Sequence, residues 1–585
     1  MHSFYEPTLQ CVNWRDELLS GVSSEYANRL TERLTDLDLK KGYVQANTWL
    51  RGNIERYQIL SQLGSMKLCV GQEVERISKR EDNKAAMRYL KGVKKRLRYC
   101  DEWIMDLSGD KLKTWANEKS RRFEMSYTAL RHKHKNHVLM FVKKNATQAR
   151  SLFDDWEEPE KVDAIIKRMV TPEWWIRQAK RQYRVIENIR RECGQVCHKE
   201  SAYVSRWGIQ RFRKQKQTNR AFLESFEAVN QFEQKFTLSE LAEKSISNSY
   251  HCKAELMVRI KGCQFLAVEN GHDCHFITLT CPSKYHAIHK ENGYRNSKFY
   301  AFGRPSPRDA NDHLKKVWAD FGKACSNKDI KHYGIRTVEP HHDGTPHWHL
   351  ILFTHPDQTQ EMLSEFKKQA YKVDPEEAGA EKRRFDARKI DPAKGGAAAY
   401  IAKYIAKNID GKNNRGECIG VDDESDIDFI NSAERVQAWK SRHGIRQFQF
   451  FGSVSITVWR EIRRLKSEIP KTFIDIYNAA KASDWKRFTV LMGGMGAGRN
   501  QVLKPFYESQ EKNQFGELKK VVKGLVSLTA EYLATRLYEW TVQRVGSGSF
   551  DLSLEGAAKP FPSSRVNNSP PRKIVYLDGL YGEVC

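Results

Sequence analysis

Two short strand-like segments joined by a tight turn are the feature that most constrains how this chain folds. Tyr333–Glu339 and His347–Phe353 are rich in β-branched and aromatic residues, and Asp343-Gly344 between them is typical of a hairpin turn. Because side chains alternate along a strand, His347 and His349 share one face and the residue between them points to the other. The sequence therefore predicts an antiparallel hairpin with a histidine-bearing face.

Further elements surround this hairpin. His275–Thr280 has the character of a third strand, and the residues from Pro307 to Phe321 have the spacing of an amphipathic helix. The order strand, helix, hairpin, helix is typical of an α+β domain built on an antiparallel sheet with flanking helices. A Gly-rich, acidic loop follows at residues 411–428.

Composition divides the chain into three parts. Residues 1–245 are basic, with apolar residues at helical spacing, which predicts a mainly helical N-terminal region. Residues 246–465 hold the α+β domain. Residues 466–585 form a C-terminal region, and its Pro-rich end, from Lys559 to Pro571, is expected to be poorly ordered.

The charge balance points to nucleic acid. Lys and Arg number 99 against 73 Asp and Glu, a net charge of +26, and such an excess attracts phosphate backbones. With 40% hydrophobic residues the chain has enough apolar side chains for folded cores, which excludes a disordered polycation. The basic run Arg211–Arg220 by itself is interpreted as a solvated helix face.

The sequence lacks the marks of membrane insertion or export. No apolar run approaches the roughly 18 residues of a membrane span, and the first residues lack a signal-peptide pattern. The 12 Cys follow no disulfide framework spacing. We expect a protein of the cytoplasm with no membrane partner.

The hairpin offers a candidate metal site. Glu339 ends the first predicted strand, and the turn brings it back beside His347 and His349. Two imidazoles and one carboxylate suit Mn²⁺ or Mg²⁺ with a phosphate oxygen in an open position, and Zn²⁺ is an alternative. His341 or His342 stands close enough to replace Glu339. A His-x-His pair alone is more often a surface or packing feature, so this motif decides nothing by itself.

A second motif lies on a predicted helix that follows Gly395-Gly396. At about 100° per residue, Tyr400, Lys403, Tyr404 and Lys407 fall on one face, with isoleucines opposite. The competing interpretation, a stripe of core aromatics, is disfavoured because the tyrosines share their face with lysines. A tyrosine with a pKa of about 10 needs nearby positive charge or a metal-polarised phosphate to attack phosphorus. We expect both lysines to contact DNA.

Three motifs in this order resemble the HUH endonuclease superfamily, and more closely the replication gene A proteins of tailed phages and prophages. They are Phe276-Ile-Thr-Leu-Thr280, Glu339-Pro-His-His-Asp-Gly-Thr-Pro-His-Trp-His349 and Tyr400-Ile-Ala-Lys-Tyr404-Ile-Ala-Lys-Asn408. The resemblance covers roughly residues 250 to 460. It implies that the domain at 246–465 is an HUH endonuclease domain with a central HUH-type antiparallel sheet.

The resemblance also implies a function and roles for the site residues. His347 and His349 would bind the metal, with Glu339 as third ligand, and Tyr400 and Tyr404 would be the nucleophiles. The protein would nick one strand of single-stranded or supercoiled origin DNA, remain on the 5′ phosphate as a phosphotyrosine, and initiate rolling-circle phage replication. A host polymerase would extend the released 3′-hydroxyl.

A host helicase is also implied, because the chain has no phosphate-binding loop of its own. The glycine cluster Gly493–Gly498 is followed by Arg499-Asn500, where such a loop needs Lys and then Ser or Thr.

Two other interpretations stay open at this stage. The first is a plasmid relaxase or HUH transposase, which the closely spaced tyrosine pair disfavours. The second is a non-catalytic basic DNA-binding protein whose histidines and tyrosines are structural. Metal-dependent nicking of supercoiled circular DNA separates the second from the enzymes.

Overall fold

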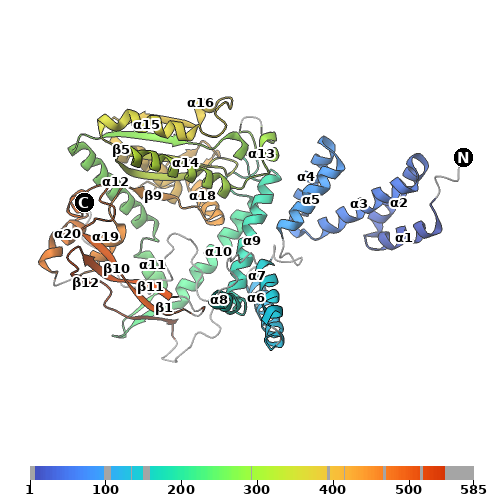
Figure 1. The fold of residues 1–585 in the computed structure, drawn as a ribbon, viewed down its shortest axis with the longest axis horizontal. Coiled ribbons are helices and arrows are strands. Elements are labelled where there is room, and N and C mark those ends of the chain that lie inside the picture. Colours follow the sequence, from blue (N-terminus) through green and yellow to red (C-terminus); the bar gives the residue numbers. More distant parts are fainter. Residues whose placement is uncertain are drawn as a thin grey trace. The chain divides into compact units, whose positions relative to one another are not determined.

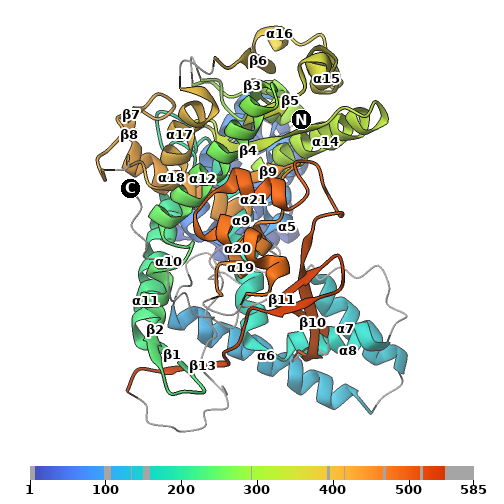
Figure 2. The ribbon, with the colours of Figure 1, turned by 90° about the vertical axis from the view of Figure 1, so that its left-hand side faces the viewer.

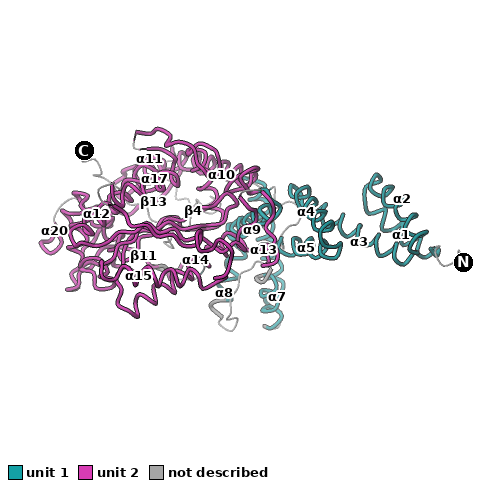
Figure 3. Tube along the Cα trace, turned by 90° about the horizontal axis from the view of Figure 1, so that it is seen from above, with its two compact units in different colours: residues 1–195, 514–516 teal, residues 196–513, 517–585 magenta. Residues whose placement is uncertain are grey.

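The computed structural model describes residues 7–97, 107, 109–132, 135–148, 159–290, 293–391, 395–413, 415–465, 469–513, 515 and 518–546. Contacts divide the chain into two compact units, coloured separately in Figure 3. Unit 1 is Met1–Gln195 with Gln514–Gly516, and unit 2 is Val196–Asn513 with Glu517–Cys585. The Pro-rich segment from Lys559 to Pro571 lies outside the described residues.

Unit 1 is helical in its described residues, as the apolar spacing predicts. Leu34 and Leu50, from neighbouring helices, share one apolar cluster. The buried guanidinium of Arg15 pairs with Asp38 at 2.6 Å, so some of the basic residues here support the fold. The elements are α1 (Leu9–Ser20), α2 (Ser24–Lys41), α3 (Tyr43–Ser61), the 3₁₀ turn η2 (Gly64–Met66), α4 (Lys67–Arg80), α5 (Asn83–Arg96), α6 (Asp110–Leu130), α7 (Lys135–Gln148), α8 (Pro159–Met169) and α9 (Pro172–Glu192).

Unit 2 is built on a five-stranded antiparallel sheet with strand order β6-β3-β5-β4-β9. The predicted hairpin lies within it, and Glu339 pairs with His347 across the two strands. The predicted α+β architecture on an antiparallel sheet is thus confirmed. The strands are β3 (Asp273–Leu279), β4 (His332–Pro340), β5 (Pro346–Thr354), β6 (Phe385–Lys389) and β9 (Phe448–Phe451).

Helices cover both faces of this sheet (Figures 1 and 2). On one face Trp348, Leu350 and Leu352 pack in an apolar cluster with three helices, α14 (Pro307–Asn327), α15 (Pro356–Ala370) and α18 (Phe429–His443). On the opposite face Ile351 and Phe353 pack with α12 (Ser249–Glu269) and α17 (Gly396–Ile409), which lie side by side in Figure 2. Alternation along β5 therefore divides its side chains between two layers.

Segments on both sides of residues 246–465 join the same unit as the sheet. Tyr203 is buried in the cluster beneath α14, and its backbone N–H donates to the carbonyl of His342 at 3.1 Å. Leu503 and Leu525 belong to the cluster on the opposite face. The composition of the chain changes near residue 245, but the boundary between the two packed units lies after Gln195.

Shorter elements complete unit 2. Strand β1 pairs with β13, which joins segments from either side of the sheet domain, and β10, β11 and β12 form a separate antiparallel sheet. No helix among the described residues combines the length and the apolar character that a membrane span requires. The remaining elements are α10 (Arg206–Ser225), β1 (Phe226–Asn230), β2 (Lys235–Thr237), α11 (Leu238–Glu243), η3 (Ser283–Tyr285), α13 (Ser297–Ala301), α16 (Ala380–Arg383), β7 (Val421–Asp422), β8 (Ile427–Asp428), α19 (Ile456–Ile462), α20 (Lys471–Lys481), α21 (Trp485–Leu491), β10 (Leu503–Lys512), β11 (Leu518–Ser527), β12 (Tyr532–Ala534) and β13 (Trp540–Arg544).

Candidate active site

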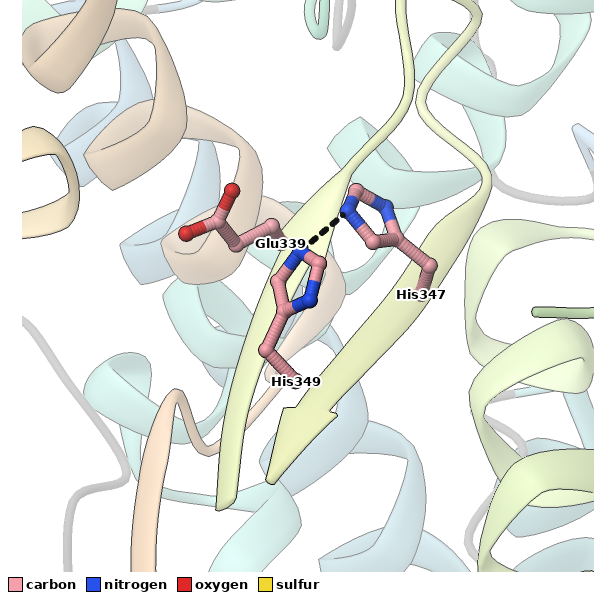
Figure 4. Close-up of side chains that lie close together, drawn as sticks. All are labelled: Glu339, His347 and His349. Atoms are coloured by element: carbon pink, nitrogen blue, oxygen red, sulfur yellow. Dashed lines mark hydrogen bonds between the residues drawn. The ribbon is translucent and has the colours of Figure 1, made fainter. Parts of the chain in front are cut away.

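The hairpin brings Glu339, His347 and His349 together at one end of the sheet (Figure 4). Glu339 lies directly across from His347, and Thr337 lies across from His349. One ligand atom from each of the three side chains lies within 4.8 Å of the other two, and all three residues are buried. The local register of two strands is sufficient to produce this arrangement.

The two imidazoles face each other through their Nε2 atoms, which are 2.9 Å apart. The Nδ1 atom of His349 contacts the Thr278 hydroxyl at 3.1 Å. Burial lowers the pKa of both rings, that of His349 to about 3, so both are neutral near pH 7. Neutral imidazole is the form that binds metal, and two facing nitrogens beside a carboxylate are a donor set that fits a divalent cation.

Glu339 is held by two residues of the tyrosine helix α17. Its Oε1 atom accepts a hydrogen bond from the amide of Asn408, and its Oε2 atom lies 3.4 Å from the ammonium of Lys407. Burial raises the pKa of Glu339, and the Lys407 ammonium opposes that shift. The contacts with α17 thus fix the carboxylate in place and compensate part of its desolvation.

The start of α17 is fixed by a close approach to α12. Gly395 and Gly396 have φ of 95° and 63°, and a Cβ at Gly396 would lie 2.4 Å from the Gln264 amide. The side chain of Gln264 in turn accepts a hydrogen bond from the backbone N–H of Ala398. Only glycine fits this approach without strain. The close approach of the two helices sets the position at which the helix carrying the tyrosines begins.

The two tyrosines differ in their distance from the histidines. The Tyr404 ring lies against the His349 ring, with 4.4 Å between centroids, and is half-buried. Tyr400 lies one turn earlier and is 40% exposed. The centroid of its ring is 6.1 Å from that of Phe276. Ile401 and Ile405 are buried on the opposite side, as the helical spacing predicts. Burial raises the pKa of Tyr404, so a catalytic Tyr404 needs compensating positive charge.

Lys403 and Lys407, which the sequence analysis places on one helix face and expects to contact DNA, lie in different environments. Lys403 is exposed, with its ammonium 5.7 Å from the centre of the Phe429 ring. The Lys407 side chain is only 12% exposed, and its ammonium lies 2.9 Å from Asp422. Burial lowers the pKa of Lys407, but Glu339 and Asp422 outweigh burial and hold it above its ordinary value. Lys407 is therefore a charged group inside the site, whereas Lys403 faces solvent.

His341 and His342 lie near the site but outside its tight group. The His341 ring packs on the His347 ring at 4.1 Å, and its Nδ1 atom lies 3.8 Å from Glu424. His342 is buried. Among the described residues, the group of potential ligands within 4.8 Å contains Glu339 and neither of these two histidines.

Sequence reasoning missed several residues that support the site. Thr278 contacts His349, and the alternation of side chains along β3 could have placed it on the histidine face. Asn408 adjoins Lys407 in the tyrosine motif, but nothing in its type indicated a bond to Glu339. Asp422 stands in the predicted acidic loop, where no spacing linked it to Lys407.

Comparisons with known proteins show which family this chain resembles. Residues 110–412 match the family model of the bacteriophage replication gene A protein. The chain is 37% identical to the replication protein of Haemophilus phage HP1 over 70% of its own length and 52% of that protein's. It is 35% identical to the replication gene A protein of Escherichia phage 186, covering 70% of this chain and 60% of that one.

A probable replication endonuclease from a prophage-like region of Salmonella typhi is 31% identical, with 70% of this chain and 53% of that protein covered. The chain thus spans little more than half the length of these relatives. No solved structure matches it significantly. With more than half of its residues matched by the family model, the chain belongs to the bacteriophage replication gene A protein family.

Proposed function

We propose that this chain is a site- and strand-specific DNA endonuclease that nicks a replication origin through a 5′-phosphotyrosine intermediate and initiates rolling-circle phage DNA replication. The observation that carries the proposal is the packing of Tyr404 on His349, 4.4 Å between ring centroids, beside the buried group of His347, His349 and Glu339. The names of relatives, replication gene A protein and probable replication endonuclease, support the same reaction class.

In this proposal the sheet is of the HUH type, and His347, His349 and Glu339 hold a divalent cation, Mg²⁺ or Mn²⁺. When bound, the cation supplies polarisation of the scissile phosphate. The neutral imidazoles would donate their Nε2 lone pairs, and Asn408 and Lys407 fix the carboxylate of Glu339, which has a ligand atom within 4.8 Å of those of the histidines. The protein's own contribution is a fixed, desolvated donor set.

Tyr404 and Tyr400 are the proposed nucleophiles. The phenol loses its proton as its oxygen forms a bond to phosphorus, the bond between phosphorus and the 3′ oxygen breaks, and that oxygen takes up a proton to become a 3′-hydroxyl, so the proton count is unchanged. The ester conserves the phosphodiester bond, so the strand can be rejoined later. A second tyrosine one turn away allows a new cleavage while the first is still linked to DNA. Lys403 contacts a neighbouring phosphate from the exposed side of α17.

The reaction needs partners that follow from its products. Single-stranded or supercoiled origin DNA is the substrate, a host polymerase extends the 3′-hydroxyl, and a host helicase separates the strands. The reaction takes place in the cytoplasm of the bacterial host.

A nicking assay tests the proposal. The full chain is incubated with supercoiled circular DNA that carries the source replicon, with Mg²⁺, Mn²⁺ or EDTA, and the conversion to relaxed circles is measured. We expect relaxation with either metal and none with EDTA. Tight binding without relaxation in any metal would contradict the enzyme and support the non-catalytic DNA-binding protein.

A further inference from the structure

The ammonium of Lys407 is shared between two carboxylates from distant parts of the chain. It lies 2.9 Å from Asp422 Oδ1 and 3.4 Å from Glu339 Oε2, and both carboxylates are almost completely buried. An ammonium held from two sides in a buried setting has little freedom to move. Its position beside Glu339 therefore depends on Asp422 as well.

Asp422 is in turn anchored by its second oxygen. Oδ2 accepts hydrogen bonds from the hydroxyls of Tyr203 at 2.5 Å, Ser425 at 3.2 Å and Ser432. Oδ1, which faces Lys407, also accepts from the backbone N–H of Glu424 at 3.3 Å. One oxygen thus fixes the carboxylate to the protein while the other directs it to Lys407.

The anchor comes from three separate segments. Tyr203 lies before the sheet and is 1% exposed, Asp422 ends β7 in the acidic loop, and Ser432 belongs to α18. Asp422 lies beyond residues 110–412, which match the family model. The cation of this buried ion pair is shared with Glu339, the carboxylate that lies across from His347 in the hairpin, so Asp422 and Glu339 are coupled through one ammonium.

We propose that Asp422 is a positioning residue for DNA cleavage, which fixes the Lys407 ammonium beside Glu339 and is itself fixed by Tyr203. This inference rests on the proposed function. With Lys407 held by Asp422, the charge of Glu339 is balanced while its carboxylate stays in place, with a ligand atom within 4.8 Å of those of the histidines. Without Asp422, Lys407 is released to pair more closely with Glu339 and to compete with a bound cation.

The test compares two neighbouring aspartates of the same loop. Asp422→Asn keeps the shape of the buried side chain and removes its charge, and Asp423→Asn makes the same charge change at an exposed position. Single-turnover nicking rate, KM for single-stranded DNA and Mn²⁺ binding without DNA, by electron paramagnetic resonance, are measured on the full chain. Residues that support metal ligands typically change activity or metal affinity about 10- to 100-fold.

We expect Asp422→Asn to lower the nicking rate about 10- to 100-fold and to weaken Mn²⁺ binding about 10-fold or more. KM should stay within about twofold, because a buried carboxylate does not touch DNA. Asp423→Asn should match wild type in all three measurements. Identical behaviour of the two variants in nicking rate and Mn²⁺ binding would overturn the proposal.

A third variant covers loss of folding. If thermal unfolding shows that Asp422→Asn does not fold, the proposal is tested with Tyr203→Phe instead. This variant removes only the hydroxyl that donates to Asp422 and keeps the ring. It should slow nicking several-fold at unchanged KM, and a wild-type rate overturns the proposal. A wild-type chain that neither nicks DNA nor binds Mn²⁺ would instead refute the proposed function and, with it, this inference.

Discussion

The two faces of strand β5 carry out different tasks with alternate residues of one segment. Trp348, Leu350 and Leu352 point into an apolar layer beneath α14, α15 and α18. His347 and His349 point to the other face, toward Glu339 and the tyrosine helix. The same backbone thus supplies a rigid core on one side and a buried donor set on the other, so the position of the histidines is determined by the packing of their neighbours.

This comparison predicts that substitutions on the histidine face remove chemistry and leave the fold intact. We expect His347→Ala with His349→Ala to reduce metal-dependent nicking below detection, because the proposed cation loses both nitrogen donors. DNA retention on a filter should change little, and the thermal unfolding midpoint should fall less than it does for Trp348→Ala, because the imidazoles are smaller than an indole. Full cleavage by this double variant with metal present would contradict the assignment of the histidines as metal ligands.

The opposite face should show the opposite result. Trp348 is 0% exposed and its indole N–H donates to Asn311 at 3.1 Å, so Trp348→Ala leaves a large cavity and an unpaired acceptor. We expect the free energy of unfolding to fall by about 3–5 kcal/mol, measured by urea denaturation. Unchanged stability, together with loss of nicking, would mean that the two faces are not divided as described.

Asn408 joins the two sides of the site, and its replacement should have an intermediate effect. Its amide donates to Glu339 and to the carbonyl of Tyr404, and its oxygen accepts from Gln447 at 2.6 Å. We expect Asn408→Ala to slow nicking about 10- to 100-fold and to raise the Mn²⁺ concentration needed for half-maximal rate. A slower rate with an unchanged Mn²⁺ requirement would show that Asn408 acts on the helix alone.

The smallest effect is expected at the exposed edge of α17. Lys403→Gln removes one solvent-facing charge, so KM for single-stranded DNA should rise a few-fold and the salt dependence of binding should become shallower by about 0.7 in log–log slope. Lys367→Gln, on the exposed side of α15, is the matched control and should leave both values unchanged. Equal effects of the two variants would show that Lys403 does not contact the bound DNA.

Local periodicity accounts for what the sequence predicted. A period of two placed His347 and His349 on one face, and a period near 3.6 placed Tyr400 and Tyr404 opposite the buried isoleucines. Both patterns are read within a few residues, and the structure has both.

Contacts between distant segments could not be predicted in this way. Asn408 reaches Glu339 across 69 residues, and Tyr203 reaches Asp422 across 219. The helical wheel gave Lys403 and Lys407 the same role, because a wheel gives the direction of a side chain from the helix axis and not the group that meets it there. Burial of Lys407 between two carboxylates depends on the acidic loop folding back over α17.

The central claim is that a tyrosine of α17 becomes linked to DNA beside the histidines. The direct measurement uses single-stranded oligonucleotides that tile the replicon encoding this chain, with Mn²⁺, followed by protease digestion and mass spectrometry of the protein–DNA adduct. We predict a 5′ phosphate on Tyr404 or Tyr400 in the wild-type chain and no adduct when both are changed to Phe, which keeps the rings and removes only the hydroxyls. A covalent adduct formed by the double Phe variant would contradict the account.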